Sequence, residues 1–347
     1  MEEKKIRIGW TSEHCCIRVI KLSKALQETG KYEIHGLVNQ VSWGTQFFNS
    51  LCFYHNKQQF RNSITRMVDQ VDLFIHSNEP NWQLNVIKET FPDAKTILDA
   101  HDLDSVRQAL IPLDEMRALT YCDGILFVSK GVKDFVCRLH EKQLKGKPTA
   151  VLEHYCNKEF FQKGLPPQDR RGLVYEGGAQ SPPYKAPNFG YRHLYPIFKQ
   201  LVDQGNELHL MFGNEDARIT YSNLGAFTYS PQVYPDLMKK LLTKKWGLIA
   251  FNNPKSDQQQ VNLTRTNKEQ EYLACGLPVI VFGAPETARW VKEHEVGLCF
   301  EKLEDITPEV LDKEYDRVKK NVDELRPTLS MEQHIDILEK LITEVLR

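Results

Sequence analysis

The sequence lacks the short motifs of several large enzyme classes. No G-x-G-x-x-G follows the first predicted strand, where the chain reads IGWTSEHCCIRV, so a nicotinamide or flavin dehydrogenase is not expected. No G-x-x-x-x-G-K-[ST] is present, which excludes the P-loop enzymes. G-x-S-x-G and H-E-x-x-H are missing as well, so neither a serine hydrolase with a nucleophile elbow nor a zinc protease of that type is predicted.

Long apolar runs and an excess of one charge are also missing. No stretch approaches 18 apolar residues, and the N-terminus passes from MEEKK directly into a short strand without an apolar signal region. We therefore expect no transmembrane segment and a cytoplasmic location. The 45 Lys and Arg residues nearly balance the 46 Asp and Glu residues, which gives no electrostatic sign of nucleic-acid or membrane binding.

The cysteines form no Cys-x-x-Cys pair, although the chain has eight of them. Most lie in apolar segments, as in GLCF, which is typical of buried free thiols in a reducing compartment. We therefore predict no metal site and no disulfide framework. The cysteines are Cys15, Cys16, Cys52, Cys122, Cys137, Cys156, Cys275 and Cys299.

Two series of alternating strand and helix patterns predict an α/β protein with two Rossmann-like domains. Strands such as ILFV are apolar throughout, which is typical of parallel strands covered on both faces. A polar stretch rich in Pro and Gly, residues 157–172, separates the two series. We predict an N-terminal domain over 1–160, a C-terminal domain over 161–325, and a terminal helix over 326–347 that packs back on the N-terminal domain.

Two places in the second series suggest a ligand site. The stretch NKEQEYLACGLPVIV, residues 267–281, predicts a helix that turns at Gly276 into a buried strand, and a core does not need the carboxylate of Glu271. In GLVYEGG, Gly177 and Gly178 close a predicted strand, where backbone N–H groups can approach a phosphate. Turn glycines without a ligand are the alternative for this pair.

The order of these segments resembles the GT-B glycosyltransferases, specifically the large retaining group of family-four type. AVLEHYCNKEFF, GLVYEGG, ELHLMFGNED, YSPQVYPDLMKKLLTKKWGLIAFNN and NKEQEYLACGLPVIV follow one another as in that group, over about residues 90–305. The resemblance implies two Rossmann-like domains facing across a cleft, where a UDP- or GDP-sugar donor meets an acceptor hydroxyl. It also implies a reaction without metal ion or other cofactor.

By the same resemblance, Glu271 binds the ribose of the donor. A carboxylate that accepts hydrogen bonds from both ribose hydroxyls would contribute about 1.5–3 kcal/mol per bond. A capping or surface role for Glu271 is the alternative. Members of the group carry a further glutamate eight residues earlier, which contacts the donor sugar, and this chain has Leu263 there.

The arginine that often follows the first donor-domain strand is also replaced, by Gly178. A cation for the diphosphate must then come from elsewhere. Lys268 is the first candidate, because some members have a lysine at this point of the signature. Lys185 and Arg192, in YKAPNFGYRH, are the alternatives, and a solvated surface role is open for each of the three.

In the N-terminal half, His101 closes the strand KTILDAH at its carboxyl end, where open α/β sheets bind ligands. It matches the histidine that the resemblance places beside the donor sugar and diphosphate, and a buried structural histidine is the alternative. Asp102 would hold the imidazole or cap the next helix. Both are predicted as catalytic residues.

The acceptor side is predicted in two stretches of the N-terminal half. Residues 41–60 form an aromatic loop containing Trp43, and HSNEPNW supplies His76 and Glu79. Aromatic faces stack on sugars or nucleobases, so a saccharide and a nucleic-acid acceptor are both open. The aromatic residues could instead pack as a small core under the loop.

The resemblance implies transfer with retention at the anomeric carbon and without a protein nucleophile. The acceptor hydroxyl would lose its proton to a diphosphate oxygen, with His101 orienting and polarising the donor. Because Leu263 and Gly178 depart from the pattern, a scaffold that binds without catalysis is an alternative, as is a nucleotide-sugar epimerase. The oligomeric state is not predicted.

Overall fold

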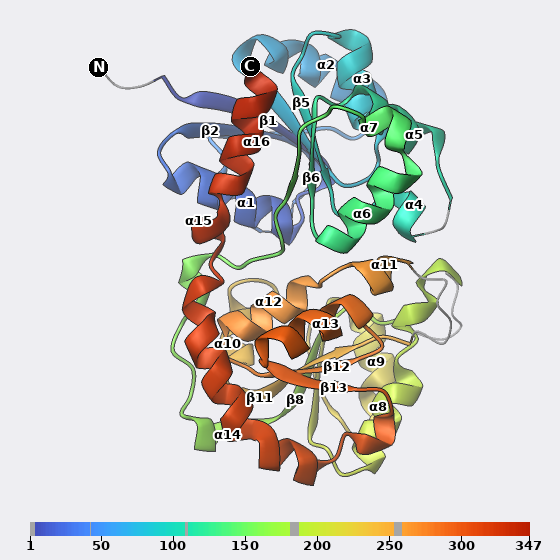
Figure 1. Cartoon of the computed structure of the whole chain (residues 1–347), viewed down its shortest axis with the longest axis vertical. Helices are drawn as coiled ribbons and strands as arrows, with labels where there is room; N and C mark the ends of the chain where they lie inside the picture. Colours follow the sequence, from blue (N-terminus) through green and yellow to red (C-terminus); the bar gives the residue numbers. More distant parts are fainter. Residues whose placement is uncertain (1–3, 42, 108–109, 181–186, 253–258) are drawn as a thin grey trace. The chain divides into compact units, whose positions relative to one another are not determined.

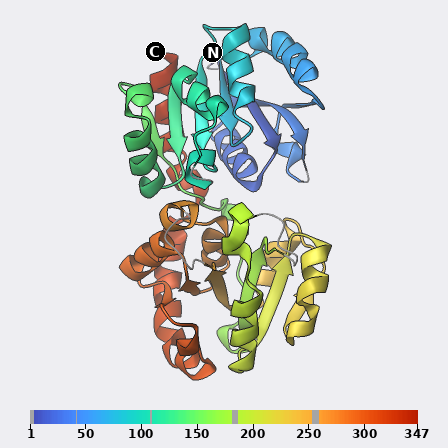
Figure 2. The ribbon, with the colours of Figure 1, turned by 90° about the vertical axis from the view of Figure 1, so that its right-hand side faces the viewer.

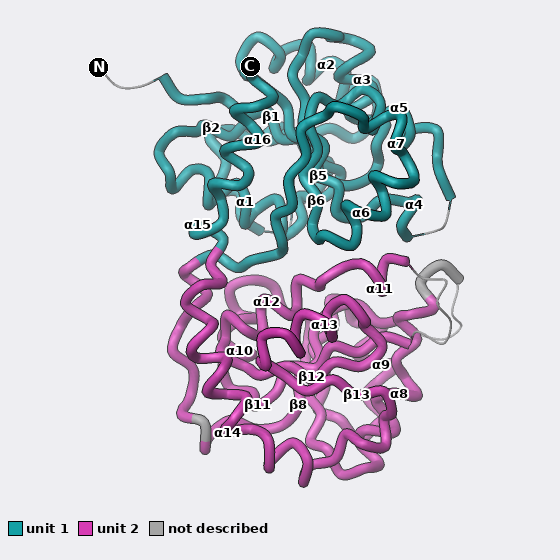
Figure 3. Tube along the Cα trace, in the orientation of Figure 1, with its two compact units in different colours: residues 1–157, 331–347 teal, residues 158–330 magenta. Residues whose placement is uncertain are grey.

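The protein consists of two compact units (Figure 3). Unit 1 contains Met1–Asn157 and Met331–Arg347, and unit 2 contains Lys158–Ser330. The divisions fall after residues 157 and 330, where the sequence predicted them after 160 and 325. The computed structural model describes residues 4–41, 43–107, 110–180, 187–252 and 259–347.

Unit 1 is built, within the described residues, on a seven-stranded parallel sheet in the order β3-β2-β1-β4-β5-β6-β7 (Figure 1). Ile8 on β1 is paired with Ile34 on β2, and it is also paired with Leu73 on β4. All three side chains are buried, as expected of parallel strands covered on both faces. The strands are β1 (Ile6–His14), β2 (Tyr32–Gln40), β3 (Ser50–Phe53), β4 (Leu73–Ser77), β5 (Thr96–Ala100), β6 (Gly124–Phe127) and β7 (Thr149–Val151).

α-Helices connect most of the consecutive strands, whereas a short 3-10 turn, Thr45–Phe47, lies between β2 and β3. Their starts follow local capping chemistry: the side chains of Asn56 and Ser129 accept hydrogen bonds from the first turns of α2 and α6. The helices are α1 (Ile17–Glu28), α2 (Lys57–Met67), α3 (Trp82–Thr90), α4 (Asp104–Arg107), α5 (Leu113–Tyr121), α6 (Lys130–Leu139), α7 (Glu141–Leu144), α15 (Met331–His334) and α16 (Asp336–Leu346).

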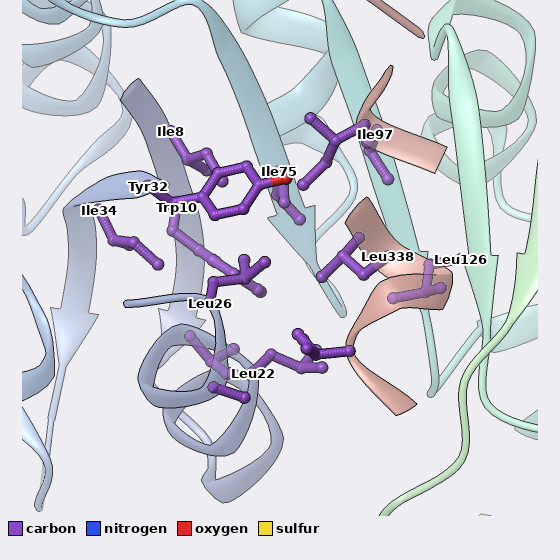
Figure 4. Close-up of a cluster of buried hydrophobic side chains, with 14 of the residues drawn as sticks. Ile8, Trp10, Leu22, Leu26, Tyr32, Ile34, Ile75, Ile97, Leu126 and Leu338 are labelled. Carbon is purple, nitrogen blue, oxygen red and sulfur yellow. The ribbon is translucent and has the colours of Figure 1, made fainter. Parts of the chain in front are cut away.

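The last helix belongs to the core of unit 1. Leu338 of α16 lies among the side chains of Ile97 and Leu126 from the sheet (Figure 4), and the same cluster includes Leu22 of α1. Figure 2 shows the red C-terminal helix against unit 1 from a second direction. Gly124 allows this close approach, because an added Cβ would lie 2.6 Å from Cγ2 of Val345.

Unit 2 repeats the architecture with a six-stranded parallel sheet in the order β10-β9-β8-β11-β12-β13, counted over the described residues. The strands are β8 (Arg171–Gly177), β9 (Leu208–Phe212), β10 (Phe227–Tyr229), β11 (Lys244–Ala250), β12 (Val279–Phe282) and β13 (Gly297–Phe300). The helices are α8 (Tyr195–Asp203), α9 (Glu215–Tyr221), α10 (Asp236–Leu241), α11 (Gln259–Leu263), α12 (Asn267–Ala274), α13 (Pro285–His294) and α14 (Pro308–Leu325).

In each sheet the order in which the chain adds strands reverses at one point, and the candidate site lies at that point. In unit 2 the chain moves outward from β8 through β9 to β10, then returns to β11 on the other side of β8. In unit 1 the same reversal lies between β1 and β4. Open α/β sheets bind ligands outside the carboxyl ends of the strands at such a switch point.

Residues 41–60 are not the continuous loop that the sequence predicted. They contain the short edge strand β3, and the helix α2 begins at Lys57. The strand was overlooked because its SLCF sequence is short and lies between aromatic residues. No helix in the described part of the chain has the length and apolar character needed to cross a bilayer.

Candidate functional site

The carboxyl end of β8 carries a glycine pair whose missing side chains leave room for two cations. Gly177 has a φ of +116°, a conformation that residues with a side chain rarely adopt. A Cβ there would lie 3.3 Å from both Cε and Nζ of Lys268. A Cβ at Gly178 would lie 3.0 Å from Nη1 of Arg192. An ammonium and a guanidinium therefore approach the backbone at the switch point of unit 2.

Lys268 is placed by the first turn of α12. The hydroxyl of Thr266, the N-cap residue, accepts a hydrogen bond from the backbone N–H of Glu269 at 3.3 Å. Nζ of Lys268 lies 4.9 Å from the ring centroid of Tyr175 and 5.2 Å from that of Phe251. Tyr175 is on β8 and Phe251 follows β11, so the ammonium lies beside the ends of both strands.

Two buried carboxylates accompany the cations. Burial lowers the pKa of Lys268; Glu176 opposes this shift, Arg192 adds to it, and Glu271 opposes it. The hydroxyl of Tyr272 accepts a hydrogen bond from the backbone N–H of Glu176 at 2.9 Å, which joins α12 to β8. The site thus combines two positive and two negative groups, a balance that a bound anion would change.

The two glutamates of α12 have different environments. Glu269 forms a buried ion pair with Arg265, whose Nε lies 3.1 Å from Oε1. The guanidinium of Arg265 stacks on Trp290 of α13 at 3.7 Å from the ring centroid. Glu269 therefore anchors α12 to the neighbouring helix, whereas Glu271 acts electrostatically on Lys268.

A cavity of about 720 Å³ opens at the carboxyl ends of β11, β12 and β13. Its volume is in the range of small-molecule sites. Phe251 lines this cavity and also contacts the ammonium of Lys268, so the cavity adjoins the cation cluster. The cavity is also lined by Asn252, Gly283, Arg289 and Glu301.

In unit 1, His101 follows directly after β5 and is buried. Its Nδ1 lies 3.3 Å from Oδ2 of Asp99. The other oxygen of this carboxylate, Oδ1, accepts a hydrogen bond from Nε of Arg18 at 2.9 Å. Burial would raise the pKa of Asp99, but Arg18 and His101 hold it well below the usual range. Asp102 instead accepts a hydrogen bond from Nδ2 of Asn78 at 3.4 Å. The carboxylate beside the imidazole is Asp99 rather than Asp102, because residues two apart on a strand lie on the same face.

The predicted acceptor-side residues are separately placed in unit 1. Trp43 is half-buried and packs edge-on against Phe47, with ring centroids 5.9 Å apart. Glu79 forms an ion pair with Arg107. His76 is only 1% exposed, and its Nδ1 lies 3.0 Å from Oγ1 of Thr11. The acceptor-side role of these residues stays a prediction.

Several aromatic residues of 41–60 pack into a small core, which was the alternative interpretation of this aromatic stretch. Tyr54 and Phe60 are buried and make edge contacts with each other, with ring centroids 5.1 Å apart. Trp82 of α3 lies 5.1 Å from Phe60 and completes the cluster. Phe53, in contrast, is 51% exposed.

Comparison with known proteins supports a common architecture. Residues 196–338 match the family described as glucosyltransferase 3-like, C-terminal domain. Sucrose-phosphate synthase from Thermosynechococcus elongatus superimposes with a TM-score of 0.70 at 14% identity, covering 99% of each chain. A glycosyltransferase from Rickettsia africae also gives 0.70 at 11% identity, again covering 99% of each. Anabaena HepE, solved with UDP, gives 0.70 at 10%, covering 98% of this chain and all of that one.

The chain has the GT-B fold. The predicted fold class, an α/β protein with two Rossmann-like domains, is confirmed. No curated protein matches the sequence.

In this GT-B protein, the residues predicted for the donor side come together in unit 2. Gly177, Gly178, Arg192, Lys268 and Glu271 all lie around the end of β8 and the start of α12. Their roles stay predictions. Lys185 lies outside the described residues. Among those described, no three His, Cys, Asp or Glu side chains are close enough to hold a metal ion.

Three residues that contact the candidate site residues, or the helix that carries them, were not singled out from the sequence. Asp99 and Cys16 contact His101 in unit 1, and Arg265 anchors α12 in unit 2. The signal for Asp99 was a carboxylate inside the otherwise apolar strand KTILDAH. Cys16 gave no such signal, because it is 85 residues from His101 along the chain.

We expect Gly177→Ala to lower both stability and diphosphate affinity. The new Cβ adds backbone strain of about 1–3 kcal/mol and displaces the Lys268 ammonium. Gly205→Ala is the control, because Gly205 has a φ of +87° with no neighbouring atom within 4 Å. Thermal unfolding should show a lower midpoint for both variants. Nucleotide titration should show a lower affinity for Gly177→Ala alone. Equal nucleotide affinity in both variants would contradict the contact with Lys268.

Acidification should destabilise unit 1 through His76. Burial lowers the pKa of His76 to about 4, and its Nδ1 lies 3.0 Å from Oγ1 of Thr11. His76 therefore takes up a proton at a higher pH in the unfolded chain than in the folded chain. The stabilisation by neutral His76 is fully present above about pH 6.5 and is lost as the pH falls toward 4. Between pH 7.5 and 5 this loss amounts to about 2 kcal/mol.

Urea unfolding followed by hydrogen exchange of unit 1 peptides measures this loss. Between pH 7.5 and 5, the free energy of unfolding of His76→Gln should fall by about 2 kcal/mol less than that of the wild type. His35→Gln, a half-buried position on β2, is the matched control and should behave like the wild type. An unchanged pH dependence in His76→Gln would show that His76 is not the titrating group.

Proposed function

We propose that the chain is a glycosyltransferase that moves a sugar from a nucleoside diphosphate sugar to an acceptor hydroxyl, with retention at the anomeric carbon. The observation that carries the proposal is the placement of Lys268 and Arg192 against Gly177 and Gly178. The fold supports it, since GT-B neighbours include a protein solved with UDP and with UDP plus glucose.

Lys268 and Arg192 are assigned to the diphosphate. Nζ of Lys268 would lie 3.3 Å from a Cβ added at Gly177, and Nη1 of Arg192 would lie 3.0 Å from one added at Gly178. A phosphate at this turn could therefore meet both cations and the backbone N–H groups. Burial lowers the pKa of Lys268, and an anion beside its ammonium would offset this effect. As the leaving group departs, the same cations stabilise its growing charge.

Arg192 also bears on the alternative of a scaffold that binds without catalysis. Gly178 stands where the resembling transferases carry an arginine. The guanidinium of Arg192 approaches Gly178 to within 3.0 Å of an added Cβ, so a positive group is supplied at this point from another part of the chain. We therefore favour an active transferase.

Glu271 is assigned to the ribose hydroxyls. It is buried on α12, while the neighbouring acid Glu269 is engaged by Arg265. We place the nucleobase in the cavity lined by Phe251, Asn252 and Gly283. Aromatic and backbone groups are common in pockets that orient a planar ligand.

In unit 1, His101 is assigned to polarising the donor, with Asp102 supporting this end of β5. Burial disfavours the imidazolium, but the Cys16 sulfur and Asp99 hold the pKa of His101 well above its usual value. A cation suits electrostatic stabilisation of a leaving group better than proton abstraction. The acceptor hydroxyl would then lose its proton to a diphosphate oxygen. We propose a saccharide acceptor, because the balanced net charge provides no general attraction for nucleic acid.

A thermal-shift panel tests the proposal directly. UDP, GDP and ADP are compared with their sugar conjugates, and one base is expected to raise the midpoint by about 5–10 °C at a hundred times its Kd. Release of nucleoside diphosphate from the conjugate, with saccharide or single-stranded nucleic acid as acceptor, then measures transfer. Binding without any release would favour the scaffold, and no shift with any nucleotide would reject the donor site.

A further inference from the structure

Cys16, His101 and Asp99 form a line of contacts at the carboxyl edge of the unit 1 sheet. Sγ of Cys16 lies 3.7 Å from Nε2 of His101. The other ring nitrogen, Nδ1, lies 3.3 Å from Oδ2 of Asp99. A nucleophile, an imidazole and an orienting carboxylate in this order activate thiols for covalent chemistry.

The charges around His101 favour an anion at Cys16. Asp99 is buried and already paired with Arg18, so these two charges compensate each other. Burial lowers the pKa of His101, but its interactions with the Cys16 sulfur and the Asp99 carboxylate outweigh this effect and raise the pKa well above its usual value. With a neutral thiol, the imidazolium would leave an excess positive charge inside the unit; a thiolate removes that excess.

Two further histidines lie near His101. His154 packs edge-on to His101, with ring centroids 6.2 Å apart, and burial lowers its pKa well below the usual value. His76, on the neighbouring strand β4, is also kept neutral, because burial lowers its pKa to about 4. Lys21 of α1 also lowers the pKa of His154.

Cys16 is placed where a reagent can reach it. It is the N-cap residue of the twelve-residue helix α1 and is half-buried. The positive end of a helix stabilises a thiolate at this position. Its neighbour Cys15 differs on each point, since it is buried and burial raises the pKa of its thiol to about 12.

We propose that Cys16 is a reactive thiolate, activated by His101 and Asp99, that peroxides and alkylating electrophiles modify covalently. With hydrogen peroxide, the sulfur attacks one oxygen, an S–O bond forms and the O–O bond breaks. The departing hydroxide takes the proton of the His101 imidazolium and leaves as water. The sulfur is oxidised by two electrons to a sulfenic acid, and the peroxide is reduced. This chemistry requires no nucleotide, although it shares His101 with the proposed transferase activity.

Alkylation of the whole protein with iodoacetamide tests the proposal, with the exposed Cys52 as an internal reference. The rate at each cysteine is read from its peptide by mass spectrometry. A thiol of ordinary pKa is about 0.3% ionised at pH 6, and its rate rises about tenfold per pH unit. Cys16 should react about tenfold faster than Cys52 at pH 6 and change less than about threefold up to pH 8. Parallel profiles for the two thiols would overturn the proposal.

Two further measurements separate activation from simple exposure. In His101→Gln the rate profile of Cys16 should become that of Cys52, and an unchanged profile would exclude His101 as the activating group. Wild type should show more ultraviolet thiolate absorbance at pH 7 than Cys16→Ser, whereas Cys52→Ser should match wild type. This second comparison holds even if His101→Gln does not fold. Peroxide followed by dimedone should label Cys16, and labelling of Cys52 alone would refute the oxidation step.

Discussion

Lys268→Met is expected to weaken binding of the nucleoside diphosphate by about 30-fold or more. Truncating one partner of a buried charge pair costs about 2–5 kcal/mol. Methionine keeps the apolar packing on Tyr175 and Phe251, so the change acts mainly through the lost ammonium. Isothermal titration with the nucleoside diphosphate selected by the panel, UDP or GDP, measures the difference.

The same titration with the unphosphorylated nucleoside identifies the cause. Because Lys268 is assigned to the diphosphate, nucleoside affinity should be unchanged within about threefold. Lys245→Met is the matched control: Lys245 lies near the opposite end of β11 and pairs with Asp312. Equal losses for nucleoside and diphosphate would mean that Lys268→Met distorts the site as a whole, and the assignment would fail.

Glu271→Gln is expected to weaken the same ligand by about 10- to 100-fold. A hydrogen bond to a charged group contributes about 1.5–3 kcal/mol, and the amide retains the shape of the side chain without its charge. The loss should appear in both the diphosphate and the nucleoside, because the ribose is common to them. This pattern differs from that expected for Lys268→Met.

A 2′,3′-dideoxy analogue of the nucleotide shows whether Glu271 contacts the ribose. The wild type should lose affinity for the analogue, whereas Glu271→Gln should bind analogue and parent almost equally. The two changes are then strongly non-additive, which is the mark of groups in contact. Glu314→Gln on α14 serves as the control, since Glu314 pairs with Arg317 at the surface. Additive losses would place the ribose elsewhere.

The sequence predicted most of the regular structure because its physical signals are local. Apolar runs such as ILFV mark parallel strands, and the stretch NKEQEYLACGLPVIV marks the helix α12 and the strand β12 that follows it. The strand β3 escaped prediction because four residues carry too little periodicity. The donor-side residues were predicted from the order of their segments along the chain, which resembles a known family, and their roles stay predictions.

What the sequence could not predict are contacts between distant residues. Glu269 and Glu271 are alike in the sequence, and only the burial of Arg265 against Trp290 distinguishes the anchoring acid from the other. Arg192 was one of three possible cations until its guanidinium was seen beside Gly178. These distinctions depend on packing between elements, which a linear pattern does not contain.

The return of α15 and α16 to unit 1 has a consequence for the order of folding during synthesis. The core around Ile97 and Leu126 is incomplete until Leu338 has been made, although residues 1–157 leave the ribosome first. Unit 2 is continuous in the chain and can close before unit 1. We therefore expect unit 2 to complete its fold before unit 1, the reverse of the usual order, and a nascent chain stalled before residue 331 to expose apolar side chains of unit 1 to chaperones.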